Sequence, residues 1–429
     1  MSVVGQNKFG FLVHPISTFS GGELQLTETP HGKPSSAAQC TDKKKKKKKC
    51  RSTPLNHGEA CLMAYHEKVR EKLLNSWKSL VDLGKALKYF PTPVPMSLPD
   101  TSTMNPLGDK TDASLEDQQH VSSTDGSCTL QAACSSPGHE NSVDLVDMCN
   151  QALVNPDIPD CKLLVLVGCH ELDHMCGRIV HNFADHHVIM KHSKSNFYIP
   201  ENSTFLLSDI TQLHLLVDHV QSSRDLKYDC IVIDPPWENR SAIRSHKYSW
   251  LSENDLLQIP LPELCNEDCL VIIWVTNKVK FSDFVQNELF PQWSVKLAGE
   301  WHWIKVTTSG EFVFDLDSPH KKPYELLLLG KYHDKALQYQ KPSPDDFACA
   351  PKRLKLSSVV RERSTKDIPH NQVIICVPSR SHSQKPFLGN VLKSYLPDHP
   401  KCLEMFARNL QPGWTSWGNE VLKFQIMDM

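Results

Sequence analysis

The segment that most constrains the fold of this chain is 228–233, which ends in the continuously apolar, β-branched run Cys230-Ile231-Val232-Ile233. Such a run is typical of a parallel strand that helices cover on both faces. Asp234-Pro235-Pro236-Trp237 follows directly. We therefore expect this tetrapeptide at the carboxyl end of a buried strand, where sheets of this kind bind their ligands.

The tetrapeptide offers hydrogen-bond acceptors beside a flat ring. Two successive prolines lack N–H donors and hold φ nearly fixed, which leaves rigid carbonyl acceptors next to the Asp234 carboxylate. Trp237 adds a surface for stacking, typically worth ~1–3 kcal/mol per base. These groups predict a pocket for a planar ring with an amino group, such as adenine. The alternative is a stiff turn in which Asp234 accepts local backbone hydrogen bonds and Trp237 covers a core edge.

From about Asp144 onward, predicted strands and helices alternate. This pattern predicts an α/β fold with an open, mostly parallel sheet and helices on both faces. The predicted strands are 163–167, 228–233, 269–275, 294–305, 324–330, 373–377, 402–406 and 420–424, and the predicted helices include 280–289 and 389–395.

Several sequence blocks between about 205 and 424 occur in an order that resembles the MT-A70 family of adenine-N6 methyltransferases. The blocks are 207–210, 234–237, 248–252, 270–277, 300–305, 318–330, 385–386 and 406–420. The resemblance implies a Rossmann-like methyltransferase fold with a permuted motif order, because the catalytic motif precedes most cofactor-binding residues. It also implies S-adenosylmethionine as the cofactor.

The resemblance assigns roles to individual residues. It places Asp234, Pro235, Pro236, Trp237 and Tyr248 in the catalytic pocket, where Asp234 and the Pro235 carbonyl would accept the two protons of the amine. The implied cofactor residues are Asp209 and Ile210 at the adenine, Lys385, Arg408, Asn409, Asn419 and Glu420 at the ribose and methionine ends, and Phe406 and Asp234 along the cleft.

The expected chemistry relies on positioning. An aromatic amine is a poor nucleophile, and acceptors that orient its lone pair would supply most of the rate without a strong base. Two positions depart from the family pattern. Gln384 stands where relatives tend to have His, and Trp250 stands where close relatives tend to have Tyr.

Two basic clusters are predicted to contact phosphates of a nucleic acid. They contain Arg240, Arg244, His246 and Lys247, and Lys352, Arg353, Lys355, Arg361 and Arg363. Each could instead be a solvated loop, and 351–355 could serve nuclear import. The resemblance implies RNA, specifically a 2′-O-methylated adenosine in a small nuclear RNA that becomes N6,2′-O-dimethyladenosine, with adenine in DNA as the competing substrate.

Two other functions compete with an active adenine-N6 methyltransferase. One is a catalytically silent, nucleic-acid-binding subunit of a methyltransferase complex, and the other is methylation of a protein side-chain amide. The intact Asp234 disfavours the first, and Asp234 with Trp237 disfavours the second. We expect activity as a monomer, and the sequence leaves an obligate partner open.

Composition sets the compartment and the domain organisation. With 15 cysteines and no signal peptide, we expect reduced thiols in the nucleus or cytosol rather than the mitochondrial matrix, with no membrane span. No metal site is predicted, because the possible ligands that lie close together in the sequence contain no Cys-x-x-Cys pair. These ligands are Cys161, Cys169, His170, His174, Cys176 and His181.

The chain is predicted to have five parts. They are a disordered basic tail (1–55) that ends in the lysine run 43–49, a helical segment (56–92), a flexible linker (93–143), an N-terminal extension that packs on the catalytic domain (144–204), and the catalytic domain itself (205–429). Helical spacing in 60–90 predicts one amphipathic helix or a broken pair, docked on the chain's own core.

Overall fold

A computed structural model of the chain describes residues 3–14, 56–91, 164–165, 175–192, 195–223, 225–238, 250–319, 321–334, 366–379 and 384–427. The linker predicted for 93–143 lies outside these residues, as do most of the tail predicted for 1–55 and the ligands considered at 161–174. The division into domains therefore stays a prediction.

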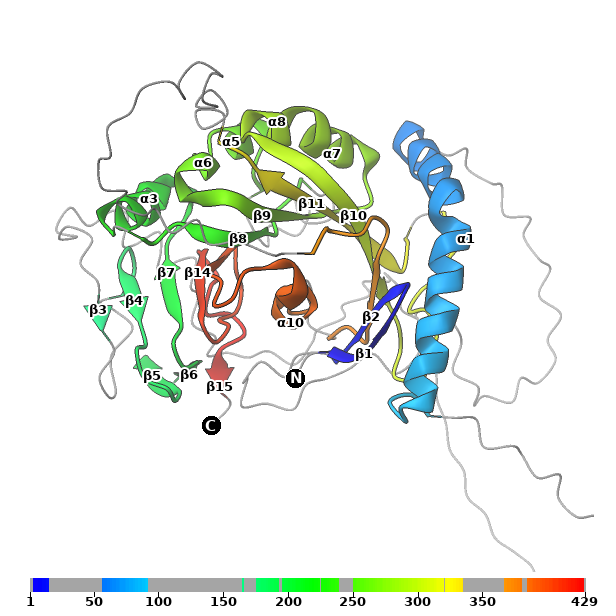
Figure 1. The fold of residues 1–429 in the computed structure, drawn as a ribbon, viewed down its shortest axis with the longest axis horizontal. Coiled ribbons are helices and arrows are strands. Elements are labelled where there is room, and N and C mark those ends of the chain that lie inside the picture. Colours follow the sequence, from blue (N-terminus) through cyan, green and yellow to red (C-terminus); the bar gives the residue numbers. More distant parts are fainter. Residues whose placement is uncertain are drawn as a thin grey trace, which may run out of the picture. The chain divides into compact units, whose positions relative to one another are not determined.

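The described residues form one large sheet with parallel strands at its centre (Figure 1). The centre is built from β9, β8, β13, β14 and β7, each parallel to its neighbour. From edge to edge the order is β1 (Val3–Asn7), β2 (Gly10–Val13), β12 (Val373–Cys376), β10 (Val295–Lys305), β11 (Tyr324–Tyr332), β9 (Cys265–Val275), β8 (Tyr228–Ile233), β13 (Cys402–Met405), β14 (Trp414–Gly418), β7 (Thr204–Leu207), β4 (Ile179–His181) and β3 (Leu164–Val165).

Helices cover both faces of this sheet, as the alternating pattern predicts (Figure 1). Ile231 and Ile233 of β8 pack into the core under one set of helices, while Cys230 and Val232 point into the core on the other side. The first set is α3 (Leu213–Ser222), α5 (Glu253–Leu257), α6 (Leu261–Leu264), α7 (Val279–Phe284), a π-helical turn (Val285–Leu289) and α8 (Phe290–Gln292). The opposite face carries α10 (Gly389–Leu392) and a 3-10 turn (Lys393–Tyr395). The predicted α/β fold, with an open, mostly parallel sheet and helices on both faces, is confirmed.

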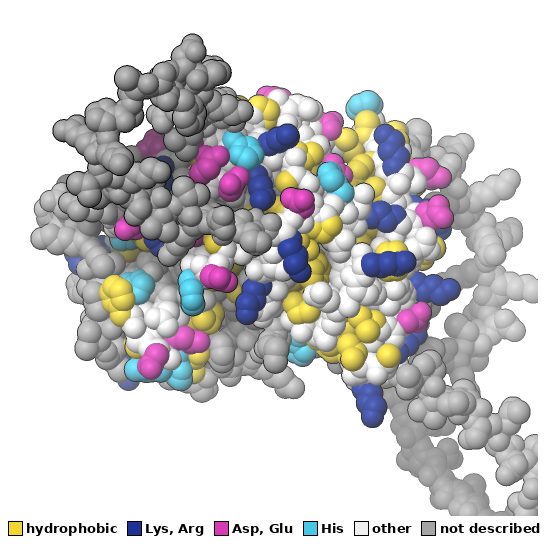
Figure 2. All heavy atoms as spheres, in the orientation of Figure 1, with side chains coloured by type: hydrophobic (Ala, Val, Ile, Leu, Met, Phe, Trp, Pro, Cys, Tyr) yellow, Lys and Arg dark blue, Asp and Glu magenta, His cyan; other side chains and the backbone are white. Residues whose placement is uncertain are grey.

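A single long helix, α1 (His57–Ala86), packs against the outer strands β10, β12 and β2. Asn56 caps it together with Glu59 in a reciprocal capping box, which satisfies two otherwise free N–H groups. Leu73 and Leu80 are fully buried in the core that α1 shares with these strands. Its outer side carries charges of both signs (Figure 2). The apolar stripe therefore docks on the chain's own core.

The start of the chain departs from the tail predicted for 1–55. Strands β1 and β2 form an antiparallel hairpin, and β2 pairs with β12 in parallel, which extends the large sheet. Gly10 makes this approach possible, since it has φ +148° and a Cβ there would lie 1.8 Å from the Val373 carbonyl oxygen. Only glycine tolerates such a position.

The strand predicted for 420–424 is wrong. Those residues form turns, and the strand is β14, which pairs with β13 on one side and β7 on the other. The apolar Val421 and Leu422 are buried beside the smaller sheet of β5 (Val188–His192), β6 (Ser195–Ile199) and β15 (Ile426–Met427). Their burial therefore reflects packing under a turn. Among the described helices, none combines the length and apolar character needed to cross a membrane.

Candidate active site

Asp234 lies at the carboxyl end of β8, in the middle of the parallel strands. Its backbone N–H donates to the Met405 carbonyl oxygen at 3.4 Å, which ties it to the end of β13. The ends of β7 and β14 lie at the same edge of the sheet, since both run parallel to β13. The loops after four strands therefore converge around Asp234, as ligand sites in parallel sheets do.

The remaining motif residues form a rigid turn. The backbone N–H of Trp237 donates to the Pro235 carbonyl at 2.8 Å, and the indole Nε1 donates to the Trp274 carbonyl at 2.8 Å. The Trp237 ring is buried and packs against Phe281, with ring centroids 4.7 Å apart. In this arrangement Trp237 anchors the turn in the core, and the Pro235 carbonyl retains one lone pair for a ligand. The motif therefore forms the stiff turn that was the alternative expectation, and this turn also shapes the site around Asp234.

Asp234 is held between two cations. Lys385 Nζ lies 3.2 Å from one carboxylate oxygen, and Arg408 Nη2 lies 3.8 Å from the other. Lys385 also lies 3.0 Å from Glu325, and Glu325 pairs with Lys305. All of these side chains are at most 22% exposed. The result is a chain of alternating charges that leads from the Asp234 carboxylate into strands β11 and β10.

This chain of charges fixes protonation states. Burial alone would raise the pKa of Glu325, but Lys385 and Lys305 lower it to about 2. Burial disfavours the charged form of Lys385, and Asp234 and Glu325 overcome that effect and raise its pKa. Lys385 is therefore a fixed positive charge beside the Asp234 carboxylate.

The predicted cofactor residues surround the same edge of the sheet. Asp209 follows β7 and caps a short 3-10 turn (Ile210–Gln212) by accepting from the Thr211 N–H at 2.9 Å. Phe406 follows β13 with φ +59° and packs on Trp417 at 5.0 Å between ring centroids. A bulky residue with positive φ is unusual and is often held at functional sites.

The loop after β14 and the turn after β13 are joined by an ion pair. Arg408 Nε lies 3.6 Å from Glu420, and Asn409 and Asn419 are partly buried in the same two loops. Because Arg408 also lies beside Asp234, the two loops that carry these residues lie next to the Asp234 carboxylate. The structure gathers the cofactor residues predicted from the sequence at one edge, and their roles stay predictions.

Three charged residues of this site were missed by reasoning from the sequence. They are Lys305, Glu325 and Glu404, which lie in strands β10, β11 and β13. The available signal for Glu404 was a charged residue inside the otherwise apolar segment Cys-Leu-Glu-Met. Such a residue needs a partner or a function, because burial of a charge is costly.

The described residues do not include the predicted nucleic-acid contacts or Tyr248. Arg240, Arg244, His246, Lys247 and Tyr248 lie between 239 and 249, and Lys352, Arg353, Lys355, Arg361 and Arg363 lie between 335 and 365. Trp250, the first described residue after the motif loop, is 46% exposed.

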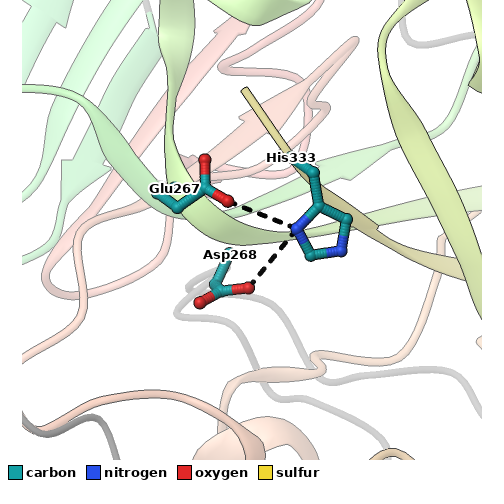
Figure 3. A group of neighbouring side chains, drawn as sticks. All are labelled: Glu267, Asp268 and His333. Atoms are coloured by element: carbon teal, nitrogen blue, oxygen red, sulfur yellow. Dashed lines mark hydrogen bonds and ion pairs between the residues drawn. The ribbon is translucent and has the colours of Figure 1, made fainter. Parts of the chain in front are cut away.

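A separate charged cluster lies at the opposite end of β9. His333 Nδ1 is 3.3 Å from Glu267 and 3.6 Å from Asp268 (Figure 3). In the described part of the chain, these three residues form a group of potential metal ligands. Both carboxylates are exposed, and the ion pairs account for the arrangement, so we assign no metal to it.

Comparisons with known proteins identify a family and several relatives of the chain. Residues 228–420 match the sequence pattern of the MT-A70 family. The chain is 37% identical over 385 residues to the N(6)-adenine-specific methyltransferase METTL4 of Mus musculus, and the aligned region covers 90% of this chain and 70% of that protein. It is 34% identical over 245 residues to the N6-methyladenosine RNA methyltransferase MTA1 of Pyricularia oryzae, covering 54% of this chain and 56% of that protein. It is 29% identical over 239 residues to the DNA N6-methyl methyltransferase of Caenorhabditis elegans, covering 56% of each.

Proposed function

We propose that this chain, which belongs to the MT-A70 family, is an S-adenosylmethionine-dependent methyltransferase that modifies the N6 amino group of adenine in nucleic acid. The observation that carries the proposal is the Asp234 carboxylate at the carboxyl end of β8, beside the Pro235 carbonyl and between Lys385 and Arg408. This arrangement joins acceptors for an amine to fixed charges for a cofactor.

The residues present fit that cofactor. Its methionine end carries an ammonium and a carboxylate, and the site offers Lys385 and Arg408 beside Asp234 and Glu420. Charged groups of both signs, largely buried, suit such a ligand because each can form a strong charge-assisted hydrogen bond. Asp209 and Asn419 would hold the adenine and ribose, as the family resemblance implies.

In this proposal the cofactor supplies an electrophilic methyl group, and the protein positions the amine. Asp234 and the Pro235 carbonyl accept hydrogen bonds from the two N–H groups of the target amine. These hydrogen bonds turn the lone pair of the nitrogen toward the methyl carbon. Positioning of this kind can supply ~7–11 kcal/mol of the barrier. Transfer of the methyl group would release S-adenosylhomocysteine and leave the target nitrogen briefly cationic. The Asp234 carboxylate stabilises that charge, and the extra proton leaves to Asp234 or to water.

We propose RNA as the preferred polymer, with a 2′-O-methylated adenosine in a small nuclear RNA as the specific target and adenine in DNA as a second substrate. A relative named as an RNA methyltransferase and one named as a DNA methyltransferase support both polymers. We also propose that the chain acts in the nucleus, where the lysine run 43–49 would direct it, and that it acts as a monomer.

The test is transfer of labelled methyl groups from S-adenosylmethionine to matched oligonucleotides. Three substrates share one sequence: RNA, the same RNA with a 2′-O-methyl group on the target adenosine, and DNA. The proposal predicts the most label in the 2′-O-methylated RNA. Equal labelling of all three would remove the polymer preference but keep the activity. Cofactor binding without transfer to any of them would favour the silent subunit, which the intact Asp234 otherwise disfavours.

A further inference from the structure

Glu404 occupies the middle of the parallel strands and faces a small cavity next to Asp234. In the sheet it lies opposite Val232 of β8 and Ser416 of β14. The cavity is lined by Glu404, Lys385, Asn409, Gln411, Trp274 and Trp414. Glu404 therefore shares a cavity with Lys385 and Asn409, which the family resemblance places at the ribose and methionine ends of the cofactor.

Glu404 differs from the other carboxylates of the site in its partners. Asp234 faces Lys385 and Arg408, and Glu325 faces Lys305 and Lys385. Among the described residues, Glu404 makes no hydrogen bond or ion pair of its own. Burial, and secondarily the negative charge of Asp234, raise the pKa of Glu404 to about 8 against the opposing effect of Arg408.

A largely buried carboxyl group without a cation stays protonated at neutral pH, and a cationic ligand would stabilise its charged form. The cations nearest to it are already shared, because Lys385 bridges two carboxylates and Arg408 bridges Asp234 and Glu420. The cavity offers Lys385 and Asn409 as donors for a carboxylate and Glu404 as the acceptor for an ammonium. An amino-acid end group presents these two charges a few bond lengths apart.

We propose that Glu404 binds the α-ammonium group of the cofactor's methionine end, while Lys385 and Asn409 bind its α-carboxylate. This assignment rests on the proposed function. It makes Glu404 a recognition residue for the amino-acid part of the ligand, separate from the acceptors at Asp234 and Pro235 that handle the amine of the substrate.

The binding of S-adenosylhomocysteine to the full chain tests the assignment without requiring activity. Calorimetry would compare this ligand with its analogue that lacks only the α-amino group, for the wild type, Glu404→Gln and Glu267→Gln. Glu267 is an exposed glutamate at the opposite end of β9, so its variant is a matched control. We expect the wild type and the control to bind the complete ligand about tenfold or more tightly than the analogue, as expected for one charge-assisted hydrogen bond. Glu404→Gln should lose this preference.

The pH dependence gives a second readout. Glu404 must lose its proton to pair with an ammonium, so wild-type affinity should rise between pH 6 and 8 and level off above about pH 8. The charged groups that face it are Asp234, Arg408 and Lys385, and the pKa of Lys385 is raised, so this lysine keeps its charge across that range. Glu404→Gln should flatten the rise.

The outcomes separate the two proposals. A wild type that binds the complete ligand and the analogue equally would overturn the role of Glu404 and leave the proposed function intact. This arm needs no variant, so it holds even if Glu404→Gln does not fold. A wild type that binds neither ligand would overturn the cofactor itself. A preference that persists in a folded Glu404→Gln would assign the ammonium to another carboxylate.

Discussion

Replacement of Glu404 by Gln should stabilise the protein without ligand. The pKa of Glu404 is raised from its ordinary value of 4.5 to about 8 in the folded chain, chiefly by burial. The folded state therefore prefers the protonated carboxyl group, whereas the unfolded chain ionises it from about pH 4.5 upward. The cost to the fold is absent below the unfolded pKa and grows as the pH rises toward the folded pKa. Gln keeps the size of the side chain and removes the titration.

The size of the effect follows from the shift. Each pKa unit corresponds to about 1.4 kcal/mol, so the interval from 4.5 to neutral pH amounts to about 3 kcal/mol. Solvent screens part of this electrostatic cost because the Glu404 side chain is partly exposed. We therefore expect Glu404→Gln to raise the free energy of unfolding by about 2 kcal/mol at pH 7. The gain should be close to zero at pH 5 and should reach its full size near pH 8.

Urea denaturation of the wild type and Glu404→Gln at pH 5, 6, 7 and 8 would measure this gain. The difference in the free energy of unfolding should widen steadily with pH. Glu267→Gln, which changes an exposed carboxylate, serves as the control and should show no such trend. A difference between wild type and Glu404→Gln that stays constant from pH 5 to pH 8, or a variant that is less stable at pH 8, would refute the reasoning.

Three further predictions address the charge network and the fold. Lys385→Met removes the cation shared by Asp234 and Glu325, and it should abolish methyl transfer and lower the free energy of unfolding by about 3–5 kcal/mol. Normal affinity of this variant for the cofactor, measured by calorimetry, would contradict the expected role of Lys385. Leu80→Ala opens a cavity under α1, where Leu80 is fully buried; urea denaturation should show a loss of about 2–5 kcal/mol, and a loss below about 1 kcal/mol would mean that α1 does not rest on this core. Gly10→Ala would place a Cβ 1.8 Å from the Val373 carbonyl oxygen; it should detach β2 from β12, and unchanged amide exchange of Val373 would disprove the close approach.

Short-range sequence patterns were enough to predict the centre of the fold. Segment 228–233, with its apolar run 230–233, became strand β8 with the same bounds, because a strand that is buried on both faces is typically apolar along most of its length. Asp234 followed from its place after that run. The convergence of Asp209, Phe406 and Glu420 on the same edge needed the family resemblance, since residues far apart in the chain carry no local mark of their proximity.

The missed features depend on pairings between distant segments. The hairpin of β1 and β2 contains few residues, and it is stabilised by β12, which lies more than 350 residues further along the chain. Similarly, Val421 and Leu422 suggested a strand because they are apolar, but their burial comes from packing under a turn. Only tertiary packing distinguishes these cases.

The charge network was missed for a related reason. Glu325 and Glu404 are the only carboxylates of β11 and β13, and their significance appears only when these strands bring them beside Lys385 and Asp234. A lone charge in such a strand predicts a buried partner without naming it. The chain of ion pairs from Lys305 to Arg408 therefore had to be found in the structure.

We propose that Asp234 serves the transfer of a methyl group to the N6 amino group of adenine. The most direct measurement is mass spectrometry of nucleosides from an adenosine-containing RNA after incubation with S-adenosylmethionine and either the wild type or Asp234→Asn. Asn keeps the shape of the side chain and removes the carboxylate charge. We predict N6-methylated adenosine with the wild type and a loss of at least about 100-fold with Asp234→Asn. Methylation at a different atom of the base, or undiminished N6-methylation by a folded Asp234→Asn, would contradict the account.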